Sequence, residues 1–388
     1  MMRIIAAPDS FKGNMSAAEA CAAIAEGVLR AAPGAAVYRL PLADGGEGTA
    51  RIVTGAAGGR FLRARVTGPL GDPVEAEFGL INDGRIAVLD MAGASGIELI
   101  GRDRLDPMRA TSYGTGELIA AALDTGAREM LIGIGGSAVN DGGIGMLSAL
   151  GFRVLDEDGK PAGQGGAALA RIASFDGSGA DPRLKGLSLK VACDVTNPLL
   201  GSRGASAVFG PQKGATEEQI PVLDRGLAKL AAAWIRAGLT EDTDRPGDGA
   251  AGGVGAALRI CLGGIMQSGA MLVMGYSGFF DRLGEADLVI TGEGKTDGQT
   301  GGGKLCSVVA RESRRAGVPV ALLSGALGGD APALFDSFDY AVSVSCGQES
   351  LEAMIRDSRR DLGFAAENLI RALELGGRRE RRDRKDKE

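Results

Sequence analysis

The hydrophobic positions of this chain form short runs that alternate with longer stretches of helical spacing. Near the amino terminus, Arg3 to Ala7 predicts a strand, Ser16 to Ala31 a helix and Ala36 to Leu40 a second strand. Ser16 is followed by Glu19, the spacing of a capping box, which supports the helix start. The last third repeats this order, with strands predicted at 288–291, 320–324 and 340–344 and helices at 304–316 and 351–375. Such alternation predicts a parallel α/β sheet.

The middle of the chain has a different pattern. Residues 60–89 alternate polar and apolar positions and contain turn dipeptides, which is typical of half-buried strands. Helices are predicted at 115–125 and 219–237, and strands at 130–134 and 189–192. We therefore predict two α/β domains. A doubly wound parallel-sheet (Rossmann/flavodoxin-like) domain is built from both termini, with a second α/β domain inserted; the expected ranges are 1–65 plus 285–377, 66–284, and a disordered tail at 378–388.

Two residue counts narrow the chemistry. The 388 residues include 64 glycines and no histidine. Without histidine, Ser-His-Asp and Cys-His catalysis and HExxH zinc sites are excluded, so proton transfer falls to carboxylates, lysine, tyrosine or water. The glycine excess has no Gly-X-Y period, and the 45% hydrophobic content is that of a globular protein.

Charge, aromatic content and cysteine usage indicate the class of partner and the cellular compartment. The net charge of −6 and the 4% aromatic content predict no nucleic-acid partner. Cys21, Cys193, Cys261, Cys306 and Cys346 are far apart and never in CxxC spacing, which favours a reducing cytoplasm. The amino-terminal apolar run is too short for a secretion signal. Residues 260–280 carry no charge, but five glycines and several polar residues favour a buried segment over a membrane span.

Two glycine-rich strings imitate nucleotide-binding motifs. Residues 133–138, GIGGSA, fit GxGxxA, and Asp156 follows at the spacing of a dinucleotide fingerprint. Glycines at 142, 143 and 145 argue against a firm helix start there and favour a wide anion-binding loop. Residues 298–304 match GxxxxGK, but Leu305 stands where a phosphate loop needs serine or threonine. Glycine N–H groups and a lysine still make an anion site.

Acidic residues lie in loops that follow predicted strands. Carboxyl ends of parallel strands face the ligand in open sheets, so these groups are expected to converge. Each alone is equally well explained as a helix cap or turn residue. Lysines are few in these loops and could stabilise phosphate oxygens. The acidic residues are Asp9, Asp44, Glu47, Asp141, Asp194, Glu293 and Asp297, and the lysines are Lys12, Lys213, Lys295 and Lys304.

Read together, these strings resemble the bacterial glycerate kinase family. The matching segments, in the family's order, are PDSFKGNMSA at 8–17, PLADGGEGT at 41–49, SYGTGELI at 112–119, IGIGGSAVNDGG at 132–143, CDVTNPLLG at 193–201, FGPQKGAT at 209–216, GAAGGVGAAL at 249–258 and DLVITGEGKTDGQT at 287–300. The resemblance implies an ATP-dependent kinase for D-glycerate that requires Mg²⁺ and has two α/β domains. Val139 departs from the family's usual threonine.

Phosphoryl transfer needs mostly positioning and charge neutralisation, which a chain without histidine can supply. We assign Asp194 and Lys12 as catalytic, and expect 2-phosphoglycerate rather than 3-phosphoglycerate as product. Glu293 and Asp297 are the predicted metal ligands. Substrate or phosphate binding is predicted for Asp9, Ser10, Asp44, Glu47, Gly135, Gly136, Ser137, Asn140, Asp141, Lys213 and Lys304. The alternatives are an NAD(P)-dependent hydroxy-acid oxidoreductase and a non-catalytic small-anion-binding module; a homodimer stays open.

Overall fold

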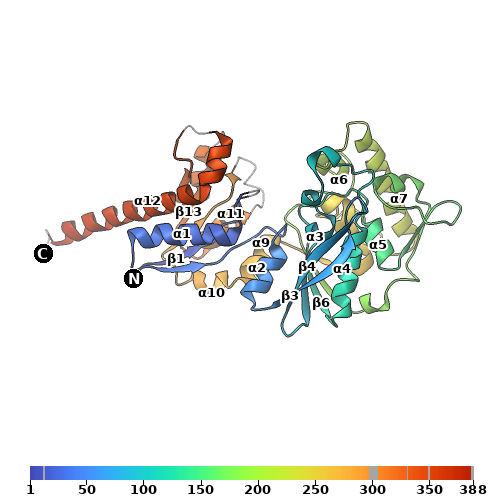
Figure 1. Ribbon diagram of the computed structural model, residues 1–388, viewed down its shortest axis with the longest axis horizontal. Helices are drawn as coiled ribbons and strands as arrows, with labels where there is room; N and C mark the ends of the chain where they lie inside the picture. Colours follow the sequence, from blue (N-terminus) through green and yellow to red (C-terminus); the bar gives the residue numbers. More distant parts are fainter. Residues whose placement is uncertain (12–13, 297–304, 330, 348–349, 386–388) are drawn as a thin grey trace. The chain divides into compact units, whose positions relative to one another are not determined.

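The computed structural model divides the chain into two compact units. It describes residues 1–11, 14–296, 305–329, 331–347 and 350–385 (Figure 1). Unit 1 comprises Met1–Ala43 and Met274–Glu388, and unit 2 comprises Asp44–Val273. The boundary expected after residue 65 falls inside unit 2, because the strand at 60–67 pairs with that unit's sheet. The boundary expected after residue 284 falls inside unit 1, beyond the start of its second segment.

Unit 1 is built on a five-stranded parallel sheet. The strands are β1 (Arg3–Ala6), β2 (Ala36–Arg39), β11 (Leu288–Thr291), β13 (Val320–Ser324) and β15 (Tyr340–Ser343), in the order β15-β13-β11-β1-β2. In terms of the strands of this sheet, that order is 2-1-3-4-5, the flavodoxin-like arrangement. The central strands are continuous apolar runs because both faces are covered, as the sequence pattern predicts.

Helices accompany the sheet of unit 1. They are α1 (Ala17–Ala31), α10 (Phe279–Leu283), α11 (Leu305–Arg315) and α12 (Leu351–Lys385), and a short parallel pair joins β12 (Lys295–Thr296) to β14 (Ala326–Leu327). The capping box predicted at Ser16 and Glu19 is present. α1 and α12 lie side by side (Figure 1). α12 continues to Lys385, so the segment expected to be disordered from 378 is largely helical; its arginines and lysines are good helix formers.

Unit 2 contains a six-stranded mixed sheet. Its strands are β3 (Arg60–Thr67), β4 (Pro73–Ile81), β5 (Ile86–Asp90), β6 (Glu129–Gly133), β9 (Ser188–Ala192) and β10 (Ile265–Gln267), in the order β10-β9-β6-β5-β4-β3. The run β5-β6-β9-β10 is parallel, whereas β3 and β4 are antiparallel neighbours. A separate antiparallel pair joins β7 (Arg153–Leu155) to β8 (Ser174–Asp176).

The helices of unit 2 include the two longest that the sequence pattern predicts there, α4 and α7. The set is α2 (Thr49–Ala56), α3 (Ala92–Ser95), α4 (Tyr113–Asp124), α5 (Ile144–Ala149), α6 (Ala205–Phe209), α7 (Gln219–Arg236) and α8 (Val254–Leu262). A further helix, α9 (Gly269–Tyr276), starts in unit 2 and runs past its last residue, Val273. The uncharged run at 260–280 is divided among α8, β10, α9 and the start of α10. In the part of the chain that the structure describes, no helix is long and apolar enough to cross a membrane.

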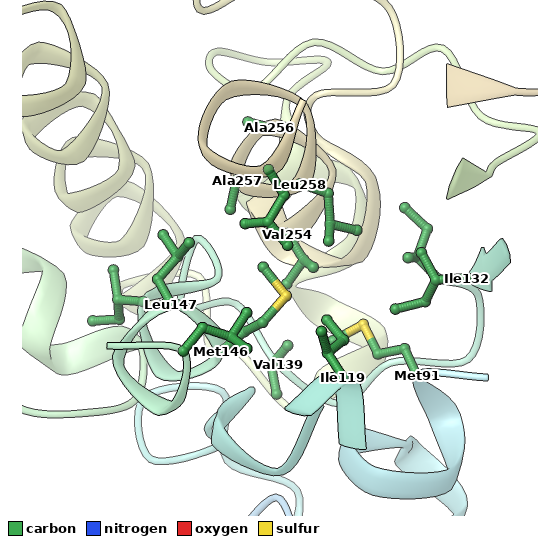
Figure 2. Close-up of a cluster of buried hydrophobic side chains, with 14 of the residues drawn as sticks. Met91, Ile119, Ile132, Val139, Met146, Leu147, Val254, Ala256, Ala257 and Leu258 are labelled. Carbon is green, nitrogen blue, oxygen red and sulfur yellow. The ribbon is translucent and has the colours of Figure 1, made fainter. Parts of the chain in front are cut away.

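A buried cluster between the sheet and its helices forms the core of unit 2. Figure 2 shows Ile132 of β6, Met146 of α5 and Val254 of α8 within this cluster. Val139 belongs to the same cluster and is fully buried. The position at which the glycerate kinase family usually has threonine therefore lies in the core, where an apolar side chain packs without needing a hydrogen-bond partner.

Candidate active site

Three loops of unit 2 meet where its parallel strands end. β5, β6 and β9 end at Asp90, Gly133 and Ala192, which pair with one another across the sheet. The loop that precedes α2 lies against the loop that follows β6, because the Gly135 N–H donates to the Gly45 carbonyl at 3.4 Å. We call this region the carboxyl-edge site and define it by Asp44, Glu47, Gly135, Gly136 and Asp194.

Asp194 holds the start of α9. Its Oδ1 accepts the Gly269 N–H and its Oδ2 accepts the Ala270 N–H, both at 3.0 Å. Desolvation raises the pKa of this carboxyl, and the negative charge of Asp44 raises it further. Two of the sequence-predicted acidic residues are therefore close enough in unit 2 to interact. Glu47, on the same loop as Asp44, is exposed.

The loops approach so closely that two glycines have no room for a side chain. A Cβ at Gly135 would lie 2.6 Å from the Cα of Gly46, and a Cβ at Gly269 would lie 2.3 Å from the carbonyl oxygen of Asp44. Both distances are well inside van der Waals contact with backbone, which cannot move aside easily. Part of the glycine excess is therefore explained by backbone packed on backbone at the carboxyl-edge site.

The loop after β6 presents backbone rather than side chains. Gly136 is exposed and Gly135 is half-buried, whereas Ser137, Asn140 and Asp141 are buried. Asn140 Nδ2 donates to Ser206 Oγ at 3.0 Å, and its buried Oδ1 has no hydrogen-bond partner among the described residues. We expected all five residues to cradle an anion. The structure exposes Gly136, leaves Gly135 half-buried and directs the three polar side chains into the protein.

Asp141 organises the turn that leads into α5. Its carboxylate accepts the Ser112 N–H and Oγ–H at 2.8 Å, together with the Gly143 and Gly145 N–H groups at 3.0 and 3.3 Å. Burial raises the pKa of this carboxyl, and its four donors oppose that rise. Ser112 is thus held as a hydrogen-bond donor and is fully buried.

Lys213 lies beneath the same loop and is 2% exposed. Its Nζ donates to Ser137 Oγ at 3.0 Å and to the Val139 carbonyl at 2.6 Å. Burial lowers the pKa of this amine to about 7, against the opposing attraction of Asp141. We expected Lys213 to bind phosphate; its contacts in the structure instead fix the loop that carries Gly135 and Gly136.

The amine of Lys213 should make stability depend on pH in a defined direction. A lysine whose pKa is lowered by folding binds its proton more tightly when unfolded, so stability rises with pH from about 7 toward the unfolded value near 10.4. Relative to Lys213→Met, the free energy of unfolding of the wild-type protein should rise by up to about 1.4 kcal/mol per pH unit above pH 7. Urea unfolding at pH 7, 8 and 9 measures it; parallel curves for the two proteins would contradict the buried amine.

Asp90 is a site residue that the sequence reasoning missed. It ends β5, and its carboxylate accepts the Gly48 and Ala50 N–H groups at 2.9 Å each. Its position could have indicated a site residue, because Asp90, like Asp194, is an acid at the carboxyl end of a buried strand. Its partners are 40 and 42 residues away in sequence, so the pairing could not be read from the local pattern.

Unit 1 has its own acidic residues at strand ends. Asp9 follows β1 and Glu293 follows β11, which are adjacent strands whose connections lead to opposite sides of the sheet. Ligands of open α/β sheets bind at such a switch point. The Asp9 N–H donates to the Gly292 carbonyl at 2.8 Å, and Asp9 Oδ1 accepts the Ser10 N–H at 2.6 Å.

The charges of Asp9 and Glu293 both raise the pKa of the same buried thiol, that of Cys306. Glu293 Oε1 accepts a hydrogen bond from Thr296 Oγ1 at 2.9 Å. Burial raises the pKa of Cys306 well above its usual value, and the charges of Glu293 and Asp9 raise it further. Asp9 and Glu293 therefore lie in one neighbourhood of unit 1, and Cys306 is held as an inert thiol. Lys12, Asp297 and Lys304 lie outside the described residues.

The described carboxylates of the two candidate sites lie in pairs, Asp44 with Asp194 in unit 2 and Asp9 with Glu293 in unit 1. Within the described ranges, no group of three or more Cys, Asp or Glu side chains could hold a metal ion. Mg²⁺ commonly binds through one or two carboxylates together with waters and substrate phosphates. The oxygen donors at the ends of β1 and β11 fit that chemistry.

In both units, loops at the carboxyl ends of parallel strands carry carboxylates, and in unit 2 they also carry glycine backbone. This arrangement defines an α/β enzyme with an acidic, glycine-lined site. The sequence model of the Glycerate kinase family matches residues 4–374. The chain belongs to the glycerate kinase family. A Bacillus subtilis protein named glycerate kinase is 45% identical over 375 residues, which are 96% of this chain and 98% of the relative.

Two further relatives span the whole fold. An Escherichia coli protein named glycerate 2-kinase is 43% identical over 378 residues, covering 97% of this chain and 99% of the relative. The crystal structure of a Salmonella typhimurium LT2 protein assigned as glycerate kinase 2 is 44% identical and superposes with a TM-score of 0.84, covering 97% of this chain and 99% of that one. These matches confirm the predicted family and the two α/β domains, and they give no support to an oxidoreductase.

Proposed function

We propose that this protein transfers the γ-phosphoryl group of ATP to the 2-hydroxyl of D-glycerate, which gives 2-phosphoglycerate and ADP. The family membership supports the kinase, and the name of the Escherichia coli relative supports the 2-hydroxyl. The observation that carries the proposal is the carboxyl-edge site, where Asp194, Asp44 and the glycine backbone at 135–136 meet. We also propose the cytoplasm as its compartment, because the five cysteines are free thiols.

Asp194 is proposed to receive the proton of the attacking hydroxyl. The two α9 N–H groups and the Ser268 side chain use three of the about four acceptor sites of this carboxylate, which leaves one for the hydroxyl. Its raised pKa makes this carboxylate a better base than an exposed aspartate. The hydroxyl oxygen forms the new bond to phosphorus as the bond to the β-phosphate bridging oxygen breaks, and ADP leaves.

The other predicted residues divide between orienting groups and phosphate contacts. Asp44 and Glu47 can accept hydrogen bonds from the hydroxyls of glycerate, and the Gly136 N–H is proposed to face its carboxylate or the phosphate. Gly135, whose N–H donates to the Gly45 carbonyl, is proposed to hold this backbone in place. Lys12 and Lys304 stay predictions as phosphate contacts. Mg²⁺, when bound, neutralises phosphate oxygens; Asp9, Ser10 and Glu293, with Asp297, are the residues proposed to hold the metal and nucleotide.

Glycerate-dependent ADP release tests the function, and the product tests the position of transfer. We expect turnover with D-glycerate, ATP and Mg²⁺, and a phosphorus NMR signal of 2-phosphoglycerate. A product that is 3-phosphoglycerate would refute the 2-hydroxyl alone. Absorbance change with NAD(P) and a hydroxy acid, or glycerate binding without ADP release, would refute the kinase.

A further inference from the structure

The start of α2 is held by a side chain from another strand. Helix starts leave unpaired N–H groups that a side chain at the cap usually accepts. The cap of α2 is Gly48, which has no side chain, and Asp90 of β5 takes this role: Oδ2 accepts the Gly48 N–H and Oδ1 the Ala50 N–H, each at 2.9 Å. The carboxylate of Asp90 therefore fixes the backbone at Gly48 and at Ala50, on either side of the first helical residue.

This turn carries two residues of the carboxyl-edge site. Glu47 directly precedes Gly48, whose φ of +87° is left-handed, and Asp44 lies at the beginning of the same loop. Asp44 Oδ1 accepts the Gly46 N–H at 3.0 Å, so the loop is also closed on itself. The orientation of both acids thus depends on where the backbone at Gly48 is held.

The carboxylate of Asp90 lies between a neighbouring strand and the loop that it holds. Asp90 pairs with Gly133 of β6, in the interior of the sheet. A Cβ at Gly133 would lie 3.1 Å from Asp90 Oδ1 and 2.7 Å from the Gly45 carbonyl oxygen. Asp90 is half-buried, and its carboxylate lies between the backbone of β6 and the loop it holds, so a displacement of one would displace the other.

We propose that Asp90 is a positioning residue of the kinase: it fixes the 44–48 loop so that Asp44 and Glu47 take their working orientation beside Asp194. In this role it acts through the Gly48 and Ala50 N–H groups, which its carboxylate accepts. This inference rests on the proposed function, which gives the loop its role in binding glycerate.

Only the ionised form of Asp90 can hold both N–H groups fully, because a protonated carboxyl spends one oxygen as a donor. Desolvation raises its pKa to about 7; the two N–H bonds and the charge of Arg51 oppose this rise, and the charge of Glu47 adds to it. The loop should therefore be held well above pH 7 and loosened below it. We therefore expect kcat/KM for glycerate to rise with pH from below 7 to above 7, because the loop is held better at higher pH.

Asp90→Asn tests the proposal, because the amide accepts one N–H and opposes the other. We expect the KM for glycerate to rise at least tenfold, the rise of kcat/KM with pH near 7 to disappear, and amide hydrogen exchange at 45–56 to accelerate. The thermal midpoint should stay near that of the wild type, since a costly buried charge is also removed. Asp181→Asn is the matched control: Asp181 accepts the Arg183 N–H at 2.9 Å at another helix start, and its loss should leave all three readouts unchanged.

Unchanged exchange at 45–56 in Asp90→Asn would overturn the proposal. Faster exchange with wild-type KM and an unchanged pH profile would overturn it as well, because the contact would then be structural only. A wild-type protein without glycerate-dependent ADP release would refute the proposed function instead, and the exchange measurement would still show whether Asp90 holds the loop.

Discussion

Asp194→Asn is expected to lower kcat for glycerate phosphorylation by about 10²–10³-fold, within the usual contribution of a general base. The amide keeps the shape of the carboxylate and can still accept one α9 N–H. It cannot accept the hydroxyl proton at neutral pH, so the chemical step loses its base. Steady-state ADP release at saturating ATP and glycerate gives kcat, and thermal unfolding reports the loss of one hydrogen bond to α9.

Asp224→Asn is the matched control for this variant. Asp224 also accepts a backbone N–H, from Gly201 at 3.0 Å, but lies at another part of unit 2 and carries no proposed chemical role. Its kcat should stay within about twofold of wild type, the small effect usual for a surface change. If Asp194→Asn kept near wild-type kcat, the carboxylate would only cap α9, and the base would have to be sought elsewhere.

Gly135→Ala is expected to reduce kcat/KM by more than about 100-fold and to destabilise unit 2 by about 1–3 kcal/mol, the usual cost of inserting a group into packed surroundings. The new methyl group would lie 2.6 Å from the Cα of Gly46, so the two loops must separate. Separation moves Asp44 away from the loop after β6 and breaks the hydrogen bond from the Gly135 N–H to the Gly45 carbonyl. ADP release and urea unfolding measure the two effects.

The matched control for this substitution is Gly55→Ala in α2. A Cβ at Gly55 meets nothing within 4 Å, so alanine should add about 1 kcal/mol of helix stability and leave kcat/KM unchanged. If Gly135→Ala behaved like Gly55→Ala, close approach of the loops would not matter for the reaction.

The sequence pattern predicts most elements of the fold because hydrophobic spacing is a local property. α7 was expected at 219–237 and spans Gln219–Arg236, and β9 was expected at 189–192 and spans Ser188–Ala192. The pattern predicts that the inserted domain starts at residue 66, whereas unit 2 starts at Asp44. The difference arises because the pairing of β3 with β4 is decided by tertiary contacts. α12 continues past its predicted end, because strong helix formers extend it where we expected fraying.

The candidate site was harder to predict, because the direction of a loop side chain depends on distant partners. Ser137, Asn140 and Lys213 are polar residues in glycine-rich segments, which favours exposure by composition. The structure buries them, with Lys213 bonded to Ser137 and Ser206 bonded to Asn140. Asp141 could be read equally well as a helix cap, and its bonds at the start of α5 are those of a cap. The assignment of Lys12, Asp297 and Lys304 stays a prediction.

Among the described residues of this histidine-free chain, desolvation brings the pKa of two groups in unit 2 to about 7. Asp90 and Lys213 both have a pKa near 7, one raised and the other lowered. As acidity increases through neutrality, Asp90 loses a negative charge and Lys213 gains a positive one, so unit 2 takes up as many as two protons beneath its ligand loops. Proton uptake near neutral pH, for which proteins most often use imidazole, is thus expected here from an aspartate and a lysine.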